Sequence, residues 1–156
     1  MKGFIYQSII GSLAIYEENG SIVRIEQTNE LCKDSILQET PIIHQTIIEL
    51  EEYFKGKRKK FTIPVHHHRQ GFQAKVLEQL MKIPYGVTLS YKEVAELIGH
   101  PHAYRAVGGA CHDNPIPLLI PCHRVIASNG RLTGFGWGLE TKKALLVLER
   151  SFINNN

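Results

Sequence analysis

The sequence lacks the pattern of a disulfide framework. Among its 156 residues are only three cysteines, Cys32, Cys111 and Cys122, and none of them forms a CxxC pair. An odd number of widely spaced cysteines is typical of proteins in a reducing compartment. We therefore expect an intracellular protein, located in the cytoplasm or, in a eukaryote, in the nucleus.

Long apolar runs and a strong excess of charge are also missing. No run reaches the ~20 apolar residues that cross a bilayer, so we expect no membrane partner. The first residues, broken by Gln7, Ser8 and Gly11, have no small-residue cleavage site and predict the first strands of a fold rather than a signal peptide. Hydrophobic residues make up 43% and charged residues 21%, which excludes a disordered or collagen-like chain.

The small net charge of +3 is unevenly placed. Residues 1–68 carry 8 basic and 9 acidic side chains, whereas residues 69–156 carry 10 and 6. An excess of positive charge in the second half points to a polyanionic partner, with an ordinary solvated surface as the alternative.

The first half is predicted to be a β-rich scaffold. Large apolar residues recur at every second position, at Leu13 and Ile15 and again at Val23 and Ile25, on either side of Asn19-Gly20, a dipeptide typical of a tight hairpin turn. Helical spacing follows over residues 44–54, and residues 61–65 alternate again as a returning strand. Nothing in this half has the spacing of a catalytic group.

Two clusters in the first half are candidate sites. Lys57-Arg58-Lys59-Lys60 could contact phosphate or form a solvated turn. His66-His67-His68 is not expected to bind a metal, because three adjacent side chains of an extended segment cannot all face one ion. We interpret it as part of a linker between the halves.

The second half is predicted to be helical. Residues 72–82 have helical spacing and end at Pro84-Tyr85-Gly86. Ser90 and Glu93 form an S-x-x-E capping box, which predicts a helix that ends at Gly99.

A second helix is expected to begin near Ala103. An apolar stripe for packing consists of Ala103, Ala106, Val107 and Ala110, and the opposite stripe consists of Arg105, Gly108, Gly109 and His112. Glycine within a helix costs ~1 kcal/mol relative to alanine, so two outward glycines suggest that a ligand approaches the backbone closely. The pattern fits a helix-turn-helix, with a helical hairpin whose glycines serve helix packing as the alternative.

Cys122 is either an inert core residue or a nucleophile. Pro121 and Arg124 interrupt what would otherwise be a buried strand, and His123 offers a base for the thiol. Glu149 lies on an apolar stripe of a C-terminal helix, where a carboxylate needs a partner such as this histidine. We therefore predict a Cys122–His123–Glu149 relay, linked to the sulfur by a water or by a turn at Pro121.

A zinc site is not predicted from these residues. Cys111-His112 and Cys122-His123 offer four candidate ligands, but adjacent side chains diverge and the spacing fits no usual zinc pattern.

The segment Ile120-Pro121-Cys122-His123-Arg124-Val125-Ile126 resembles the active-site signature of the O6-alkylguanine-DNA alkyltransferases, the methylated-DNA–protein-cysteine methyltransferases. Matching motifs occur in the same order at residues 72–73, 83–86, 90–91, 105–108, 114–115 and 148–149. The resemblance covers about half of the chain, and the first half is similar to the family's N-terminal domain only in layout.

The resemblance implies an RNase-H-like α/β domain over residues 1–68 and a winged helix-turn-helix domain over residues 69–156. It implies a monomer that binds double-stranded DNA in the minor groove without reading sequence. No cofactor is expected. The structural zinc ligands of some relatives have no visible counterpart in the first half of the chain.

The resemblance also implies single-turnover DNA repair. Cys122 would take the alkyl group from O6-alkylguanine, with O4-alkylthymine as an open extension, and would keep it as a thioether. His123, through a water and supported by Glu149, would help to form the thiolate, because a free thiol has a pKa of ~8.5. Tyr91 would assist the leaving base and crowd a DNA phosphate.

The remaining roles follow from the same resemblance. The damaged base must leave the duplex, and Arg105 would fill the vacancy while Gly108, Gly109 and His112 face the groove. Asn114 would tie this face to the Pro121–Arg124 turn.

The substrate pocket would consist of the Val125 carbonyl, Phe135, the Gly136 N–H and Trp137. Trp137 stands where many relatives have a small residue, which predicts a narrow pocket. Phe135 stands where tyrosine is frequent, so a hydroxyl contact is absent there.

Three other functions fit parts of the sequence. A non-catalytic binder of alkylated bases would have another residue at Cys122, and a winged-helix regulator would have base-reading side chains at Gly108 and Gly109. A thiol hydrolase would need an oxyanion hole that the sequence does not reveal. The preference between methylguanine and methylthymine, the alkyl size and cooperativity on DNA stay open.

Overall fold

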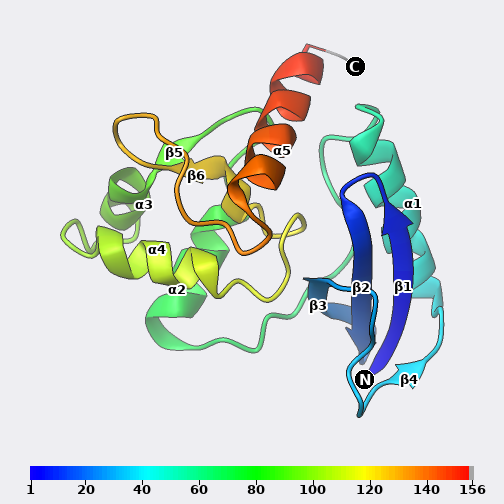
Figure 1. The fold of residues 1–156 in the computed structure, drawn as a ribbon. Helices are drawn as coiled ribbons and strands as arrows, with labels where there is room; N and C mark the ends of the chain where they lie inside the picture. The colour runs from blue at the N-terminus through cyan, green and yellow to red at the C-terminus, as the bar shows by residue number, and fades with distance from the viewer. Residues whose placement is uncertain (155–156) are drawn as a thin grey trace. The chain divides into compact units, whose positions relative to one another are not determined.

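The structure is a computed structural model that describes residues 1–154, and it divides into two compact units, residues 1–68 and 69–154 (Figure 1). Within this range, no helix has both the length and the apolar character needed to cross a bilayer.

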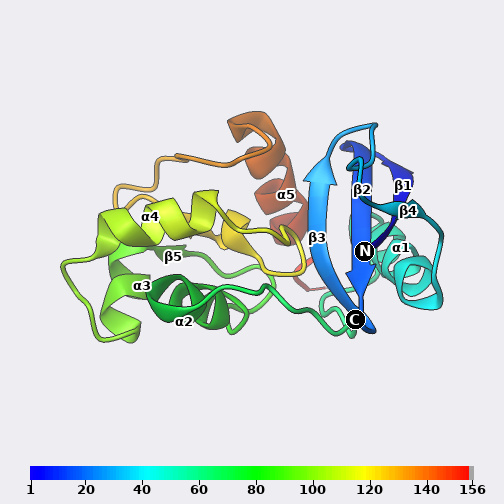
Figure 2. The same cartoon turned by 90° about the horizontal axis from the view of Figure 1, so that it is seen from below.

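The first unit is a four-stranded sheet with one helix. Strands β1 (Lys2–Ser8), β2 (Gly11–Glu18) and β3 (Ser21–Gln27) pair antiparallel, and the short β4 (Ile36–Leu37) pairs parallel with β1. The order across the sheet is β3-β2-β1-β4. Helix α1 (Pro41–Phe54) lies along the sheet and contacts its first three strands (Figure 2).

The predicted hairpin around Asn19-Gly20 is confirmed. It joins β2 to β3, and both residues have positive φ, 50° for Asn19 and 82° for Gly20. Two such residues in sequence form the tight turn whose twist matches that of the strands. Strand β2 is buried on both faces: Leu13 and Ile15 lie on one, and Ala14 and Tyr16 on the other.

The predicted strand over residues 61–65 is wrong. Only Val65 forms an isolated bridge with Ile22, flanked by hydrogen bonds from the Ile22 N–H to the Pro64 carbonyl (2.9 Å) and from the His66 N–H to the Ile22 carbonyl (3.0 Å). Pro64 has no N–H to donate, and the Thr62 N–H donates to a side chain instead. The backbone therefore cannot continue a regular ladder.

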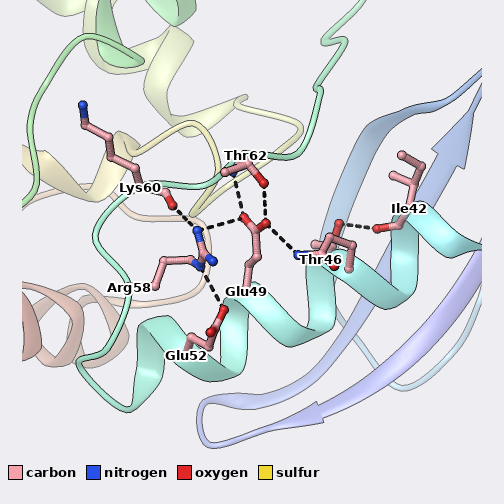
Figure 3. A network of polar contacts seen from close by, with 8 residues as sticks. Ile42, Thr46, Glu49, Glu52, Arg58, Lys60 and Thr62 are labelled. Carbon is pink, nitrogen blue, oxygen red and sulfur yellow. Dashed lines mark hydrogen bonds and ion pairs between the residues drawn. The ribbon is translucent and has the colours of Figure 1, made fainter.

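The side chain that binds Thr62 is Glu49 of α1, which is fully buried (Figure 3). Its carboxylate accepts hydrogen bonds from the Thr62 N–H (2.7 Å), the Thr62 hydroxyl (2.5 Å) and the Gln45 amide (3.0 Å). Arg58 lies 3.7 Å from it and also forms an ion pair with Glu52. Burial raises the pKa of Glu49, but these hydrogen bonds and the Arg58 charge outweigh it and lower the pKa overall.

This network changes the interpretation of the basic run at residues 57–60. The Arg58 guanidinium is held by Glu52 and donates to the Lys60 carbonyl (2.9 Å) (Figure 3). Arg58 thus fixes the turn, whereas Lys57 and Lys60 are exposed.

The second unit is built mainly from helices. Helices α2 (Gly71–Leu80), α3 (Tyr91–Leu97) and α4 (Tyr104–His112) contact one another (Figure 2). Two short parallel strands, β5 (Leu89–Ser90) and β6 (Val125–Ile126), and the C-terminal helix α5 (Leu139–Phe152) complete it.

The predicted capping box of α3 is confirmed. The Ser90 hydroxyl accepts from the Glu93 N–H (3.0 Å), and the Glu93 carboxylate accepts from the Ser90 N–H (2.9 Å). Just beyond the helix, Gly99 has a φ of +81°, the left-handed conformation in which helices commonly end.

The predicted packing stripe of α4 needs correction at one end. Val107 and Ala110 are buried as expected, but Ala106 is exposed, and Cys111 takes the third buried position. Helix α4 begins only at Tyr104, and the spacing of its inner face is counted from Val107 as i, i+3 and i+4.

We predict that Glu49→Gln destabilises the first unit. The neutral amide leaves donors of Thr62 and Arg58 without a carboxylate, at a cost of about 1–3 kcal/mol in the free energy of unfolding. Because the pKa of Glu49 is lowered by folding, the stability that it contributes is full at neutral pH and is lost as pH falls below the unfolded value of ~4.3. Urea unfolding followed by circular dichroism should show a lower free energy of unfolding for Glu49→Gln than for wild type at pH 7, and this difference should narrow in acid. The exposed Glu51→Gln serves as the control, and an equal effect of both substitutions would contradict the assignment.

Candidate active site

Cys122 lies in a sharp turn between two buried segments. Residues Cys122–Arg124 form a single 3₁₀ turn after Pro121, in which the Cys122 N–H donates to the Ile120 carbonyl (2.8 Å) and the Arg124 N–H to the Pro121 carbonyl (3.0 Å). The turn breaks the extended segment, as the sequence suggested at Pro121, and gives its three side chains directions that a strand would not allow.

Asn114 joins the end of α4 to this turn. Its amide donates to the Ile120 carbonyl (2.8 Å), and its side-chain oxygen accepts from the Ile116 N–H (3.0 Å). The Asn114 side chain also interacts with the Cys122 thiol. The contact of Asn114 with backbone that the sequence predicted is therefore present, at Ile116 and Ile120.

Glu149 of α5 is the centre of a buried polar cluster, with an exposed fraction of 1%. One oxygen lies 2.6 Å from His123 Nε2 and 3.0 Å from Arg124 Nη2, and the other accepts from Arg124 Nε (2.9 Å) and from the Gly86 N–H (3.0 Å). Burial raises the pKa of Glu149, but the hydrogen bonds and charges of His123 and Arg124 outweigh it and hold the pKa far below its usual value.

The ionised Glu149 fixes the protonation of His123. A carboxylate only accepts hydrogen bonds, so the hydrogen of the neutral imidazole lies on Nε2 and the lone pair on Nδ1. Within residues 1–154, this buried Nδ1 has no hydrogen-bond partner. Burial lowers the pKa of His123 although Glu149 acts to raise it, so the ring rests in its neutral, basic form.

The Cys122 thiol is protonated at rest. It is 4% exposed, and burial raises its pKa to about 11, although the Asn114 hydrogen bond and the Lys142 charge oppose this rise. Burial also raises the pKa of the neighbouring Cys111 to about 12. A reaction at Cys122 therefore needs both a base and a nearby positive charge.

Lys142 of α5 supplies such a charge, and its side chain is fully buried. Its Nζ donates to the Val125 carbonyl (2.6 Å) and the Thr133 carbonyl (2.8 Å), and it lies 3.5 Å from the Tyr91 hydroxyl. Tyr91 in turn donates to the Thr133 carbonyl (3.1 Å). Burial raises the pKa of this tyrosine.

The other predicted pocket residues follow in the segment before α5. Val125 and Phe135 are buried, Trp137 is half-buried, and Gly136 is exposed. The Phe135 and Trp137 rings meet edge to face, with their centroids 5.9 Å apart.

The predicted outer face of α4 is open. Arg105, Gly109 and His112 are exposed, and a methyl group on Gly109 would meet no atom within 4 Å. A methyl group on Gly108 would lie 3.8 Å from the Tyr91 ring, an ordinary van der Waals contact, so the packing against α3 does not itself require glycine here.

A cleft of about 420 Å³ lies beside Tyr91. Lys92, Tyr104, Ala127 and Ser128 complete its lining. The sequence reasoning gave none of these four a role.

Sequence reasoning also missed Arg124 and Lys142 as members of the site. The sequence places Arg124 in the interrupted strand and in the Pro121–Arg124 turn without a role of its own, yet it shares the Glu149 carboxylate with His123. Lys142 lies seven residues before Glu149, on the same face of α5 as Leu145, and this i, i+3, i+7 spacing was the signal that could have found it.

In the described part of the chain, no three histidine, cysteine or acidic side chains come together as metal ligands. Cys111 is buried and His112 is exposed, so these neighbours diverge.

The second unit combines an exposed helix face with a buried cysteine that is followed by a histidine bound to a carboxylate. Family models identify both units: residues 1–67 match the ribonuclease-like domain of 6-O-methylguanine DNA methyltransferase, and residues 71–151 match its DNA binding domain. The chain belongs to this family.

Individual relatives agree with this assignment. A methylated-DNA–protein-cysteine methyltransferase of Methanosarcina barkeri is 50% identical over 66% of this chain and 65% of its own length, and the constitutive enzyme of Bacillus subtilis is 40% identical over 90% of each. The structure of Mycobacterium tuberculosis OGT in complex with DNA is similar with a TM-score of 0.91 and 35% identity, over 97% of this chain and 94% of that one. The predicted fold class is thereby confirmed, and the likeness extends to the first half.

We predict that Glu149→Gln strongly destabilises the second unit. Removal of the carboxylate charge leaves the buried Arg124 guanidinium uncompensated, which costs about 3–5 kcal/mol. Because folding lowers the pKa of Glu149, this stabilisation is complete above pH ~4.3, the pKa of an unfolded glutamate, and is lost only in strong acid. Urea unfolding at pH 7 measures the loss. Glu140→Gln, at an exposed position in the first turn of α5, should have little effect, and a small loss for Glu149→Gln would refute the central role of this carboxylate.

Proposed function

We propose that this protein repairs DNA by moving an alkyl group from O6 of guanine to Cys122, once per molecule. The observation that carries the proposal is the turn that places Cys122 directly before a histidine whose basic Nδ1 is left available because Glu149 binds Nε2. Membership of the methyltransferase family supports the substrate class.

The proposed reaction begins with the thiol proton. A water accepts the proton from Cys122 and passes a proton to Nδ1 of His123, because adjacent residues of a turn rarely contact each other directly. Glu149 then faces an imidazolium and stabilises it through the 2.6 Å hydrogen bond. This route follows from the tautomer that the buried carboxylate imposes.

The transfer itself forms one bond and breaks one. The Cys122 sulfur bonds to the alkyl carbon, and the bond from that carbon to guanine O6 breaks with its electron pair left on the base. Tyr91 donates a proton to the base, so that neutral guanine leaves. The proton that His123 took up ultimately restores the Tyr91 hydroxyl. A thioether is a poor leaving group, and the protein is therefore consumed.

The DNA-binding roles belong to the same proposal. The exposed, glycine-containing face of α4 carries no row of base-reading side chains, which favours contact with the minor groove without sequence preference. Arg105, exposed in the first turn, fills the space of the extruded base, and His112 faces the groove from the last turn. We propose that the protein acts as a monomer on duplex DNA, inside the cell.

The Val125 carbonyl, Phe135, the Gly136 N–H and Trp137 are proposed to hold the extruded base. Two aromatic rings that meet edge to face support a small pocket.

Incubation with duplex DNA that carries O6-methylguanine is expected to add the mass of one methylene unit to the Cys122 peptide. The modification should stop at one per protein, because the thioether does not react further. Peptide mass spectrometry checks this, with Cys111→Ala still modified and Cys122→Ala unmodified. Persistent lesion with an unchanged protein mass would instead favour a non-catalytic binder.

Arg105→Ala is expected to slow repair of duplex DNA by at least about tenfold, since unstacking a base costs a few kcal/mol that the inserted side chain offsets. Reaction with free O6-methylguanine base should change little, because no duplex has to open. Parallel rate measurements on the two substrates test this. Equal losses on both would show that Arg105 acts in the pocket rather than in base extrusion.

A further inference from the structure

The positive charge of the first unit is gathered in one loop. This basic loop, residues 55–60, has the sequence Lys-Gly-Lys-Arg-Lys-Lys and holds five of the eight basic residues of the unit. The remainder of the unit carries three basic and all nine acidic residues. Most of the first unit would therefore repel a polyanion, and the basic loop would attract it.

The backbone of the basic loop is fixed where α1 ends. The Gly56 N–H donates to the Tyr53 carbonyl (3.0 Å), and the Lys57 N–H donates to the Glu52 carbonyl (2.8 Å). Gly56 is buried and has a φ of 75°, the left-handed conformation that commonly follows a helix. The backbone that carries the lysines is thus ordered before any ligand binds, which lowers the entropic cost of binding.

Arg58 spends its charge on the fold of the loop. Its guanidinium is bound by Glu52 (3.0 Å), lies 3.7 Å from the buried Glu49, and donates to the Lys60 carbonyl (2.9 Å). Two nearby carboxylates are thereby matched inside the unit. Lys60 joins this network through its backbone, and its side chain is directed away from it (Figure 3).

Lys57 and Lys60 carry charge for which the fold gives no use. Both side chains are exposed, and within residues 1–154 neither ammonium forms an ion pair with a carboxylate. A positive charge at the end of a helix is favourable, which accounts for Lys55 directly after α1. This effect falls off beyond the last helical turn, so it does not account for Lys57 and Lys60.

The chemistry of the basic loop fits a phosphate backbone. An ammonium group offers hydrogen-bond donors and no acceptor, so its ligand is an anionic oxygen. The loop has no apolar side chain, whereas segments that lie in a membrane surface bury such side chains among the lipids. Duplex DNA presents one negative charge per about 1.7 Å of its axis, and it is the substrate in the proposed function.

We propose that the basic loop is a second DNA contact, in which Lys57 and Lys60 bind backbone phosphates of the duplex. This inference rests on the proposed function for the identity of the polyanion. It gives the unit without catalytic groups a part in substrate binding. The contact carries no sequence preference, because phosphates are the same at every base pair. Since both units belong to one chain, even a weak contact at the loop adds to the total affinity.

The test compares two double variants of the full chain that lose the same charge. Lys57→Gln with Lys60→Gln removes the proposed contacts, and Lys2→Gln with Lys33→Gln removes two exposed lysines elsewhere in the first unit. Binding to an undamaged, fluorescently labelled duplex is measured by anisotropy over a range of salt concentrations. Each lost phosphate contact reduces the slope of log K against log salt by about 0.9.

We expect the loop variant to lose about one to two units of this slope and about tenfold or more in affinity at ~0.1 M salt. The control variant should stay within about twofold of wild type. Both should unfold in urea like wild type, because neither pair of side chains takes part in the Glu49 network. Equal slopes for the two variants would overturn the proposal.

A second measurement needs no variant and covers a loop variant that does not fold. Wild type is treated with an acetylating reagent with and without undamaged duplex, and the modified lysines are found by peptide mass spectrometry. DNA should protect Lys57 and Lys60 and leave Lys2 and Lys33 reactive. Equal acetylation of Lys57 and Lys60 in both samples would refute the contact.

The remaining outcomes separate this proposal from its alternatives. If the loop variant loses binding to vesicles that contain phosphatidylserine but keeps the salt slope on DNA, the basic loop binds lipid and the DNA contact is rejected. A chain that shows the reduced slope but never methylates Cys122 would reject the proposed function alone, because undamaged DNA requires no transfer. Repair of O6-methylguanine with equal slopes in both variants would reject the loop contact alone.

Discussion

The second unit depends on one buried carboxylate. Glu149 projects from α5 and is bound by His123 and Arg124 of the cysteine turn and by the Gly86 N–H at the end of the α2 segment. Arg124 extends the cluster by donating to the Ile83 carbonyl (2.8 Å). A single charged group thereby fixes the turn and the histidine tautomer together. The same bonds that stabilise the fold thus set the direction in which the imidazole can accept a proton.

The first unit also depends on a buried carboxylate, but this one has no proposed part in the reaction. Glu49 also projects from a helix, is fully buried and holds an irregular segment through a backbone N–H, here that of Thr62. In both units a buried carboxylate accepts a hydrogen bond from the backbone N–H of an irregular segment, Thr62 in the first and Gly86 in the second. The difference lies in the partner, because Glu49 binds a hydroxyl and an amide, whereas Glu149 binds an imidazole with a second, basic nitrogen.

Local signals predicted the elements well. The Asn19-Gly20 hairpin and the Ser90–Glu93 capping box depend on neighbouring residues alone, and both are present. The returning strand at residues 61–65 failed because Glu49, distant in sequence, takes the Thr62 N–H. A period-two pattern records which side chains are apolar and cannot record where the backbone hydrogen bonds go.

The site was predicted only in part, because local sequence signals do not show its long-range contacts. An acidic residue on an apolar stripe required a buried partner, and His123 is one. Arg124 and Lys142 escaped notice because arginine and lysine are ordinarily solvated, and only the tertiary fold buries them. Lys142 could have been found from its place on the stripe of Glu149, but its contacts with Val125 and Thr133 depend on how a loop returns to α5.

Trp137 is the single tryptophan of the chain, which determines what its intrinsic fluorescence reports. It is half-buried, rests against the edge of Phe135 and precedes the helix that carries Lys142 and Glu149. Intrinsic fluorescence excited at the indole band therefore originates from this one side chain, beside the proposed substrate pocket. A ligand that binds between these two rings changes the polarity around the indole. The intrinsic fluorescence of the unlabelled protein therefore reports binding at this place.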